Sequence, residues 1–318
     1  MNESWDECLN SSSPDACYSS QKVLINLLSI PLSSIIVAGN LVTIVGIIGN
    51  KRLHNPTNYY FLSLLVADLC TGLILPSIPR MSFKSGFAFW ICFFFHLFPN
   101  FIFLSFLSNM VVVHYDRYVC IVHPLHYGIS WIHESVPIVI LTTWVLPLLF
   151  TSLPLIGWNN WNPGTTYCYF KFIFPSSYIY LEIYGLLIPS IVAITVMIVR
   201  ILYVARRQMN AIKKIHRSVH SHSASPVEQE MDFKYAKCVI AFFLIFLLCW
   251  VPYIVYIHVS FFVRSRGSRL HIILSCLGIS SAALVPFVLV LNNKEYFELW
   301  RNVFQRVCQC CGKETNLN

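Results

Sequence analysis

Long apolar stretches recur along the whole chain, and short polar segments separate them. Each stretch exceeds about 18 residues, the length at which a helix crosses a hydrocarbon core of about 30 Å. Lipid offers the backbone no hydrogen-bond partners, so stretches of this kind form helices. The pattern therefore predicts seven membrane-spanning helices, at residues 23–49, 57–79, 88–121, 135–157, 177–205, 234–262 and 270–291.

An amphipathic segment follows the seventh stretch, at residues 292–308. Charged and amide side chains fall on one helical face, and the apolar side chains on the other are Tyr296, Phe297, Trp300, Val303, Phe304 and Val307. This pattern is typical of a helix that lies in the membrane surface, and it predicts a short eighth helix. Three thiols at its end are candidates for palmitoylation, namely Cys308, Cys310 and Cys311. A zinc site is the less favoured interpretation, because no histidine nearby completes a tetrahedral set.

The composition agrees with a membrane protein. Of the 318 residues, 56% are hydrophobic and 11% are charged, whereas soluble domains carry about 25% charged residues. The predicted fold class is therefore an all-α membrane protein, a seven-transmembrane helix bundle with a short amphipathic eighth helix. Of the 22 lysines and arginines, 15 lie on the side of the C-terminus, which by the positive-inside rule is the cytosol. The net charge of +8 then faces the anionic inner leaflet, and we expect no nucleic acid partner because no binding motif accompanies the charge.

This topology divides the chain into four regions. Residues 1–22 form an extracellular tail with two glycosylation sequons, at Asn2 and Asn10, and residues 23–291 form the transmembrane bundle. Residues 292–308 form the amphipathic helix, and residues 309–318 form a short cytosolic tail. No basic segment followed by an apolar one precedes the first span, so we expect no cleaved signal peptide.

Four cysteines face the oxidising side of the membrane in this topology. Cys92 opens the third span and Cys168 lies in the loop after the fourth, which favours a disulfide between them. Cys8 and Cys17 form the other external pair, and whether they are bridged stays open.

Two acidic residues lie well inside the predicted spans, where a charge costs about 2.5–3.5 kcal/mol. Asp68 lies halfway along the second helix, and Glu182 lies in the outer third of the fifth. Asp68 has two interpretations: a hydrogen-bonded node shared with Asn40, or a sodium or proton site that biases a conformational switch. Glu182 either snorkels to the membrane surface or forms the wall of an external pocket, and we favour the pocket.

A series of motif residues is distributed over the predicted helices: Gly39–Asn40, Asp68, Cys92, Asp116–Arg117–Tyr118, Trp144, Pro189, Phe246 with Trp250 and Pro252, and Pro286. In this order and spacing they resemble the rhodopsin-class (class A) G protein-coupled receptors over residues 22 to 308. The resemblance implies a plasma-membrane receptor rather than an enzyme, with no cofactor or metal. Its implied partners are a small steroidal or lipid agonist, a heterotrimeric G protein and the surrounding membrane lipid.

The resemblance also gives Arg117 a role. It implies that Arg117 pairs with an acid of the sixth helix when the receptor is inactive, for which Asp232 is the candidate, and meets the G protein when active. We expect Arg117 to snorkel to the membrane surface with Asp116 as its counter-ion. The other residues implied in switching are Tyr118, Phe246, Trp250, Pro252 and Asp68.

One departure from the family concerns the seventh helix. Val285 and Leu289 stand where most of the class has the Asn and the Tyr of Asn-Pro-x-x-Tyr. Switching therefore relies on other polar groups, and a sodium site around Asp68 is disfavoured.

Residues 98–105, 152–164 and 173–190 resemble the class A receptors for bile acids, and they include loop residues that packing alone does not dictate. This implies a steroidal acid ligand, the stimulatory G protein and a rise in cyclic AMP. The implied ligand-binding residues are Asn100, Glu182, Tyr253, Ser260, His96, Phe101 and Tyr178, with Trp250 beneath them. His96 and Ile279 depart from the tyrosine and the serine that the resemblance leads us to expect, and a shifted steroid preference or an orphan receptor stays open.

A seven-helix transporter is the rival class. Transporters are built from internal repeats, and the sequence contains no such symmetry. Phosphorylation sites for arrestin are few, with Ser218, Ser221, Ser223 and Ser225 before the sixth span and Thr315 in the tail. We therefore expect weak arrestin recruitment.

Overall fold

The computed structural model describes residues 14–77, 89–162, 173–218, 226–262, 268–292 and 294–314. Within them, seven helices are long and apolar enough to cross a membrane, which confirms the predicted number of spans. The elements that build the spans are α2 (Pro14–Gly49), α3 (Pro56–Ile74), α5 (Phe89–Val122), α8 (Val136–Ser152), α10 (Ser176–Tyr180) continued by the π-helical η3 (Leu181–Leu187) and α11 (Ile188–Ser218), α12 (Pro226–Phe262) and α13 (Ser268–Asn292). The shorter elements are η1 (Lys51–Leu53), α6 (Pro124–Tyr127), α7 (Trp131–Glu134) and η2 (Leu153–Ile156), and α14 (Lys294–Glu314) follows the last span.

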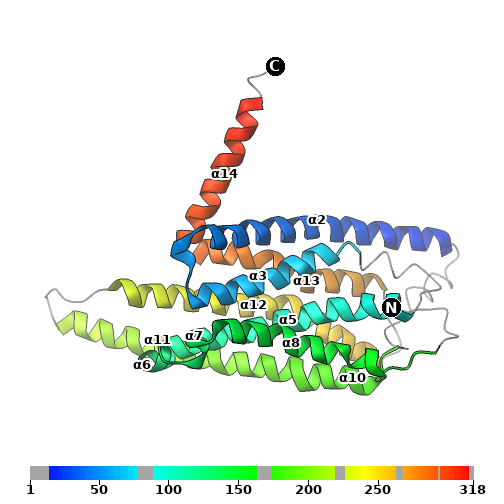
Figure 1. The fold of residues 1–318 in the computed structure, drawn as a ribbon, viewed down its shortest axis with the longest axis horizontal. Helices are drawn as coiled ribbons and strands as arrows, with labels where there is room; N and C mark the ends of the chain where they lie inside the picture. Colours follow the sequence, from blue (N-terminus) through cyan, green and yellow to red (C-terminus); the bar gives the residue numbers. More distant parts are fainter. Residues whose placement is uncertain are drawn as a thin grey trace.

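The spans lie side by side in one elongated bundle, and α14 leaves it steeply at one end (Figure 1). We call this the α14 end; the opposite end carries α10 and the start of α2 (Figure 1). Helix α5 packs against α3, α8, α11 and α12, so it runs through the middle of the bundle. A residue on α5 can therefore contact almost any other span.

Large apolar side chains cover the outside of the bundle. Leu146 on α8 is 63% exposed and Leu248 on α12 is 73% exposed. Such surface would destabilise a soluble protein by about 25 cal/mol for each Å² left in water. Lipid tails are as apolar as leucine, so these side chains form the lipid-facing surface of the spans.

Local sequence signals explain both ends of α3. The Asn55 side chain caps the start by accepting a hydrogen bond from the Asn58 amide at 2.9 Å, and Pro56 occupies the first helical position. The helix ends at Ile74 rather than at residue 79 as the hydropathy predicted. Leu75 is still helical, but Pro76 follows it and has no amide to donate to the Gly72 carbonyl, so the ladder of backbone hydrogen bonds stops there.

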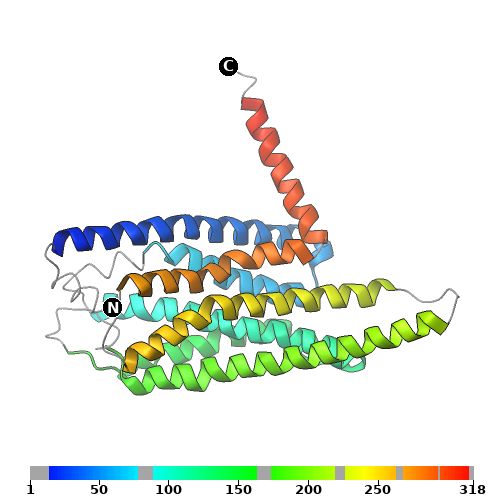
Figure 2. The ribbon, with the colours of Figure 1, turned by 180° about the vertical axis from the view of Figure 1, so that it is seen from behind.

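Two prolines alter the geometry of the later spans. Pro252 lies inside α12, where it removes a backbone hydrogen bond and clashes with the preceding turn. The yellow-to-gold α12 accordingly changes direction along its length (Figure 2). Pro189 lies just after η3 and offers no amide to the carbonyl of Gly185, while the Ile188 amide bonds to Ile183 five residues back.

The first turns of α14 are anchored on the bundle. The Tyr296 side chain is fully buried, and its hydroxyl donates to Asn58 Oδ1 at 3.1 Å. Leu299 lies so close to Gly46 of α2 that no Cβ fits there, and Trp300 Nε1 donates to Thr43 Oγ1 at 3.3 Å. The predicted eighth helix is thus present, and it runs on to Glu314, past residue 308.

Candidate functional site

Three of the predicted ligand-binding residues meet inside the bundle, towards the opposite end. Asn100 on α5 donates from Nδ2 to Glu182 Oε2 on η3 at 3.1 Å and to the Tyr178 hydroxyl on α10 at 3.4 Å. We call Asn100, Tyr178 and Glu182 the polar trio. Tyr253 of α12 lies close enough to Glu182 for an electrostatic interaction. The trio is a compact set of donors and acceptors in an otherwise apolar region.

Aromatic packing holds the trio in place. The fully buried Tyr178 ring stacks on Phe150, with ring centroids 5.1 Å apart, and on Phe174 at 5.5 Å. Trp158 meets the same ring edge-on at 5.6 Å. Such contacts add about 0.5–1.5 kcal/mol each beyond area burial, so the hydroxyl is presented by a rigid ring. The π-helical turn of η3 carries Glu182, and π-turns are frequent at functional sites.

The other predicted ligand residues are distributed around the trio. His96 contacts Phe174 edge-on with ring centroids 6.0 Å apart, so it belongs to the same aromatic group. Phe101 lines a different cavity, of about 320 Å³, between α5 and α8, and no member of the trio lines it. Ser260 is part of α12, but its side chain lies outside the described ones.

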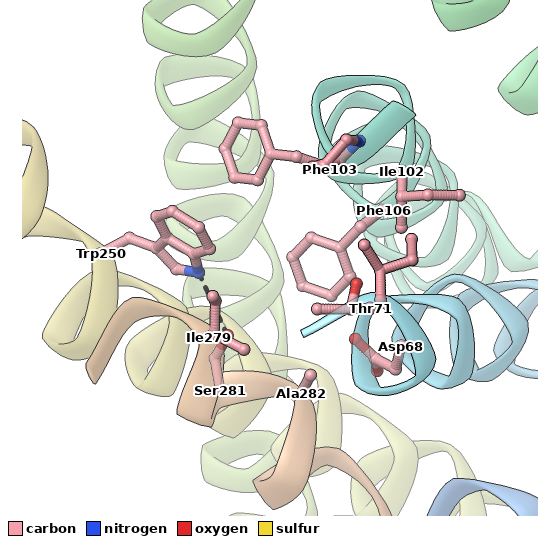
Figure 3. Close-up of a pocket in the computed structure, with 11 residues that line it drawn as sticks. Asp68, Thr71, Ile102, Phe103, Phe106, Trp250, Ile279, Ser281 and Ala282 are labelled. Atoms are coloured by element: carbon pink, nitrogen blue, oxygen red, sulfur yellow. Dashed lines mark hydrogen bonds between the residues drawn. The ribbon is translucent and has the colours of Figure 1, made fainter. Parts of the chain in front are cut away.

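A second cavity, of about 120 Å³, lies beneath Trp250 between α3, α5, α12 and α13. Figure 3 shows its residues, with the Asp68 carboxyl group and the Phe106 ring facing the Trp250 indole across it. Trp250 Nε1 donates to Ser281 Oγ at 3.1 Å. Its ring contacts Phe103 at 4.7 Å and Phe246 at 6.3 Å between centroids, so the implied switch residues Trp250 and Phe246 do pack together.

Asp68 is buried, with 1% of its surface exposed, and its Oδ2 atom has no hydrogen-bond partner. The hydrogen bond to Asn40, which was one of the two interpretations of Asp68, is not formed. Asn40 Nδ2 donates instead to the carbonyls of Ile36 and Ala282, at 2.8 and 3.1 Å, because the closely packed backbone offers these acceptors first. Asn40 Oδ1 also lacks a partner.

The charged pair of the Asp116–Arg117–Tyr118 motif is buried near the α14 end. Arg117 donates from Nη2 to Asp116 Oδ2 at 2.8 Å and from Nε to the same oxygen at 3.0 Å. Thr57 Oγ1 donates to Asp116 Oδ2 at 2.9 Å, and the Tyr127 hydroxyl donates to Asp116 Oδ1 at 2.9 Å. Tyr118 packs beside the pair on Tyr115 and His123. We call Asp116, Arg117, Thr57 and Tyr127 the arginine cluster.

The expectation that Arg117 snorkels to the membrane surface was wrong. Its side chain is buried, with 3% of the residue exposed, because Thr57 and Tyr127 close over the charged pair. Burial, and then the negative charge of Asp116, raise the pKa of the Tyr127 hydroxyl. The hydroxyl therefore stays protonated and remains a donor. Asp232 lies in α12, but its side chain is outside the described ones, so its pairing with Arg117 stays a prediction.

Sequence reasoning missed Thr57 and Tyr127, which lie 59 residues before and 11 residues after Asp116 and carry no motif. It also missed His114 of α5, which is fully buried. His114 Nδ1 lies 2.7 Å from the Met110 carbonyl, and Nε2 lies 3.1 Å from the Val239 carbonyl of α12. A buried histidine within an apolar run was the available signal, and the structure makes it a polar link between α5 and α12.

The predicted modification sites lie mostly outside the described residues. Cys92 is buried and disulfide-bonded, while its expected partner Cys168 is outside the described ranges. The sequons at Asn2 and Asn10 are outside them as well, and the side chains of Cys308, Cys310 and Cys311 are not described. Among the described residues, no His, Cys, Asp or Glu side chains group as they would around a metal ion.

Comparison with known proteins gives one family and two kinds of relative. The family described as 7 transmembrane receptor (rhodopsin family) matches residues 39–289. The chain is 39% identical over 287 residues to G-protein coupled bile acid receptor 1 of Rattus norvegicus and 38% identical to that of Homo sapiens; each alignment covers 89% of this chain and 85% of the relative. Adenosine receptor A2b of Homo sapiens is 27% identical over 327 residues, covering 93% and 95%.

Proposed function

Because this chain belongs to the rhodopsin family of seven-transmembrane receptors, we propose that it is a receptor for bile acids or related steroidal acids. We propose further that it couples to the stimulatory G protein and raises cyclic AMP. As a member of this family it is a multi-pass protein of the plasma membrane and not an enzyme. Its partners are of the kind that the family has, a small-molecule agonist and a G protein.

The polar trio is the observation that carries the ligand proposal. A bile acid is a rigid apolar body with a few hydroxyls and one carboxylate. Such a ligand suits a mostly apolar site that contains a few fixed polar groups. Asn100, Glu182 and Tyr178 are three such groups, joined by hydrogen bonds and set among aromatic rings. The similarity to bile acid receptors, which extends over 89% of the chain, supports the same ligand class.

The carboxyl group of Glu182 sets the proposed direction of the ligand. Two carboxylates repel strongly where the dielectric constant is low, so a ligand carboxylate beside Glu182 is disfavoured and is placed away from it. Hydroxyls on the body of the ligand are the groups that pair with the trio. The acid faces the basic residues that the sequence places beyond the opposite end of the bundle, namely Arg80, Lys84, Arg264, Arg266 and Arg269. In this proposal the opposite end is extracellular and the α14 end is cytosolic, in keeping with the positive-inside rule.

The arginine cluster is the proposed coupling element. In the described arrangement Arg117 is fully engaged with Asp116, Thr57 and Tyr127, so a G protein meets it only after the cluster opens. Trp250, Phe246 and Pro252 form the proposed path from ligand to cluster, and weak arrestin recruitment follows from the few phosphorylation sites. The disulfide between Cys92 and Cys168, glycosylation at Asn2 and Asn10 and palmitoylation near residue 310 complete the proposal.

The test is cyclic AMP accumulation in cells that express the chain, against a panel of bile acids, bile alcohols and neutral steroids. We expect a dose-dependent rise with acids that Arg117→Ala abolishes at equal surface expression. Asn100→Ala and Glu182→Ala should raise the half-maximal concentration at least about tenfold, the loss of one or two hydrogen bonds to a charged group. Ser177→Ala, which alters an exposed hydroxyl next to Tyr178, is the matched control and should leave potency unchanged.

Flat cyclic AMP with verified surface expression would refute the coupling proposal. A response to neutral steroids that exceeds the response to acids would refute the ligand class and leave a receptor for another steroid or lipid. Full potency of both Asn100→Ala and Glu182→Ala would show that the trio does not bind the ligand.

A further inference from the structure

The cavity beneath Trp250 contains a polar atom that the protein itself does not satisfy. Asp68 Oδ2 is buried without a hydrogen-bond partner, and its carboxyl group is directed into the cavity (Figure 3). Leaving such an acceptor unpaired costs about 1–3 kcal/mol, and more for a charged group. An occupant with a hydrogen-bond donor at this point would recover that free energy.

Most of the remaining cavity wall is apolar, and the cavity is the size of one ring. Its walls include Ile74, Pro99, Phe103, Phe106 and Ile279. The volume of about 120 Å³ is close to that of the engineered apolar cavity of about 150 Å³ that binds benzene in another protein. The size and the walls therefore select a single six-membered ring, and the acid selects a polar substituent on it.

The cavity is elongated along the bundle and approaches the polar trio. On α5 it extends from Phe106 back to Pro99, seven residues and roughly 10 Å at the helical rise of 1.5 Å per residue. Pro99 directly precedes Asn100, the member of the trio that holds Glu182. The cavity and the trio thus share the same stretch of α5.

A hydroxyl is the substituent that fits Asp68 best. It donates to a carboxylate and accepts from a carboxylic acid, so the pair forms in either state of Asp68. The two other hydroxyl groups in the wall are already committed as donors, since Thr71 Oγ1 donates to the Ala67 carbonyl at 3.0 Å and Ser281 Oγ donates to the Gly278 carbonyl at 2.8 Å. Neither wall hydroxyl therefore donates to Asp68.

We propose that the cavity beneath Trp250 is a subsite for one hydroxylated ring of the agonist, whose hydroxyl hydrogen-bonds to Asp68. This rests on the proposed steroidal ligand, and it assigns to Asp68 a contact with the ligand in addition to any part in switching. The bound ring lies against Trp250 and Phe106, so occupancy couples directly to the aromatic side chains between the ligand and the arginine cluster.

The test measures equilibrium binding of two probes to purified full-length receptor in nanodiscs. Lithocholic acid carries one ring hydroxyl, and cholanic acid has the same skeleton without it. We expect the wild-type protein to bind lithocholic acid roughly ten- to a hundredfold more tightly, which corresponds to a hydrogen bond to a charged group. In Asp68→Leu the preference should fall to about threefold or less, whereas Glu182→Gln should retain it, because the one ring hydroxyl of lithocholic acid is bound at Asp68.

The opposite pattern, with the preference lost in Glu182→Gln and kept in Asp68→Leu, overturns the subsite while the proposed function stands. Equal binding of both acids by the wild-type protein also overturns it. If Asp68→Leu does not fold, Ile279→Phe fills the cavity from the facing wall and should likewise remove the preference.

If neither acid binds, the proposed function fails, and a fragment decides the subsite separately. Cyclohexanol should then raise the thermal midpoint of the wild-type receptor more than methylcyclohexane, its apolar counterpart, and should lose this advantage in Asp68→Leu. Equal shifts by the two fragments overturn the subsite.

Discussion

Replacing Tyr127 by Phe removes one hydroxyl from the arginine cluster and leaves the ring in place. The hydroxyl donates to Asp116 Oδ1 at 2.9 Å and accepts from Arg117 Nη2 at 3.3 Å. Hydrogen bonds to charged groups contribute about 1.5–3 kcal/mol. Tyr127 is only half-buried, so water replaces part of what is lost and the lower figure applies. About 1.4 kcal/mol is a factor of ten in an equilibrium constant, so the arrangement with a freed Arg117 gains about tenfold in population.

The assay is basal signalling per receptor at the cell surface, measured as ligand-free cyclic AMP or as nucleotide exchange on added G protein. We expect basal activity to rise several-fold, with about tenfold as the ceiling, and the thermal midpoint of the purified receptor to fall. Tyr184→Phe is the matched control, because Tyr184 is 55% exposed on the lipid-facing side. If Tyr127→Phe matches Tyr184→Phe in both measurements, the arginine cluster does not restrain Arg117.

Two further links test whether polar contacts hold the described arrangement. His114→Leu removes the contact of Nε2 with the Val239 carbonyl, 3.1 Å away, which should lower the free energy of unfolding by about 1 kcal/mol and raise basal nucleotide exchange. Exchange and stability equal to those of the wild-type protein would contradict this expectation. Tyr296→Phe leaves Asn58 Oδ1, in a fully buried residue, without its donor from α14; we expect a thermal midpoint several degrees lower, and an unchanged midpoint would show that water replaces the hydroxyl.

The number and order of the spans could be predicted from hydropathy, because the membrane imposes a minimum length on every span. The ends of the helices depend on other causes. α3 ends at Ile74 because of Pro76, a local signal that hydropathy averages away. The π-helical turn of η3 lies just before Pro189, but the carboxylate that it carries is fixed by Asn100, far away in the sequence. Long-range contacts of this kind are outside the reach of a periodicity argument.

Only part of the candidate site could be predicted, because some of its contacts join residues that the sequence does not link by a motif or a periodicity. Family motifs identified Asn100, Glu182 and Arg117, and the structure brings the first two together. It also corrected the exposure expected for Arg117, because its burial depends on Thr57 and Tyr127. Neither of those residues stands out in the sequence, since threonine is ordinary at the start of a helix such as α3 and tyrosine is ordinary at the end of a short helix such as α6.

Asp68 and Asp116 show why burial alone does not assign a function to an acid. Both are buried, Asp68 inside α3 and Asp116 in the last turns of α5, and hydropathy treats them alike. Asp116 receives hydrogen bonds from Arg117, Thr57 and Tyr127, so the protein itself satisfies its oxygens. Asp116 therefore restrains Arg117. Asp68 Oδ2 has no hydrogen-bond donor and lies beside a mostly apolar cavity the size of one ring, so only a ligand that enters the cavity can complete its hydrogen bonds. An acid whose hydrogen bonds are complete stabilises one conformation, whereas an acid whose hydrogen bonds are incomplete selects a ligand. On this reasoning the agonist acts at Asp68, whose hydrogen bonds are incomplete, and the G protein acts at the arginine cluster once the hydrogen bonds of Asp116 are broken.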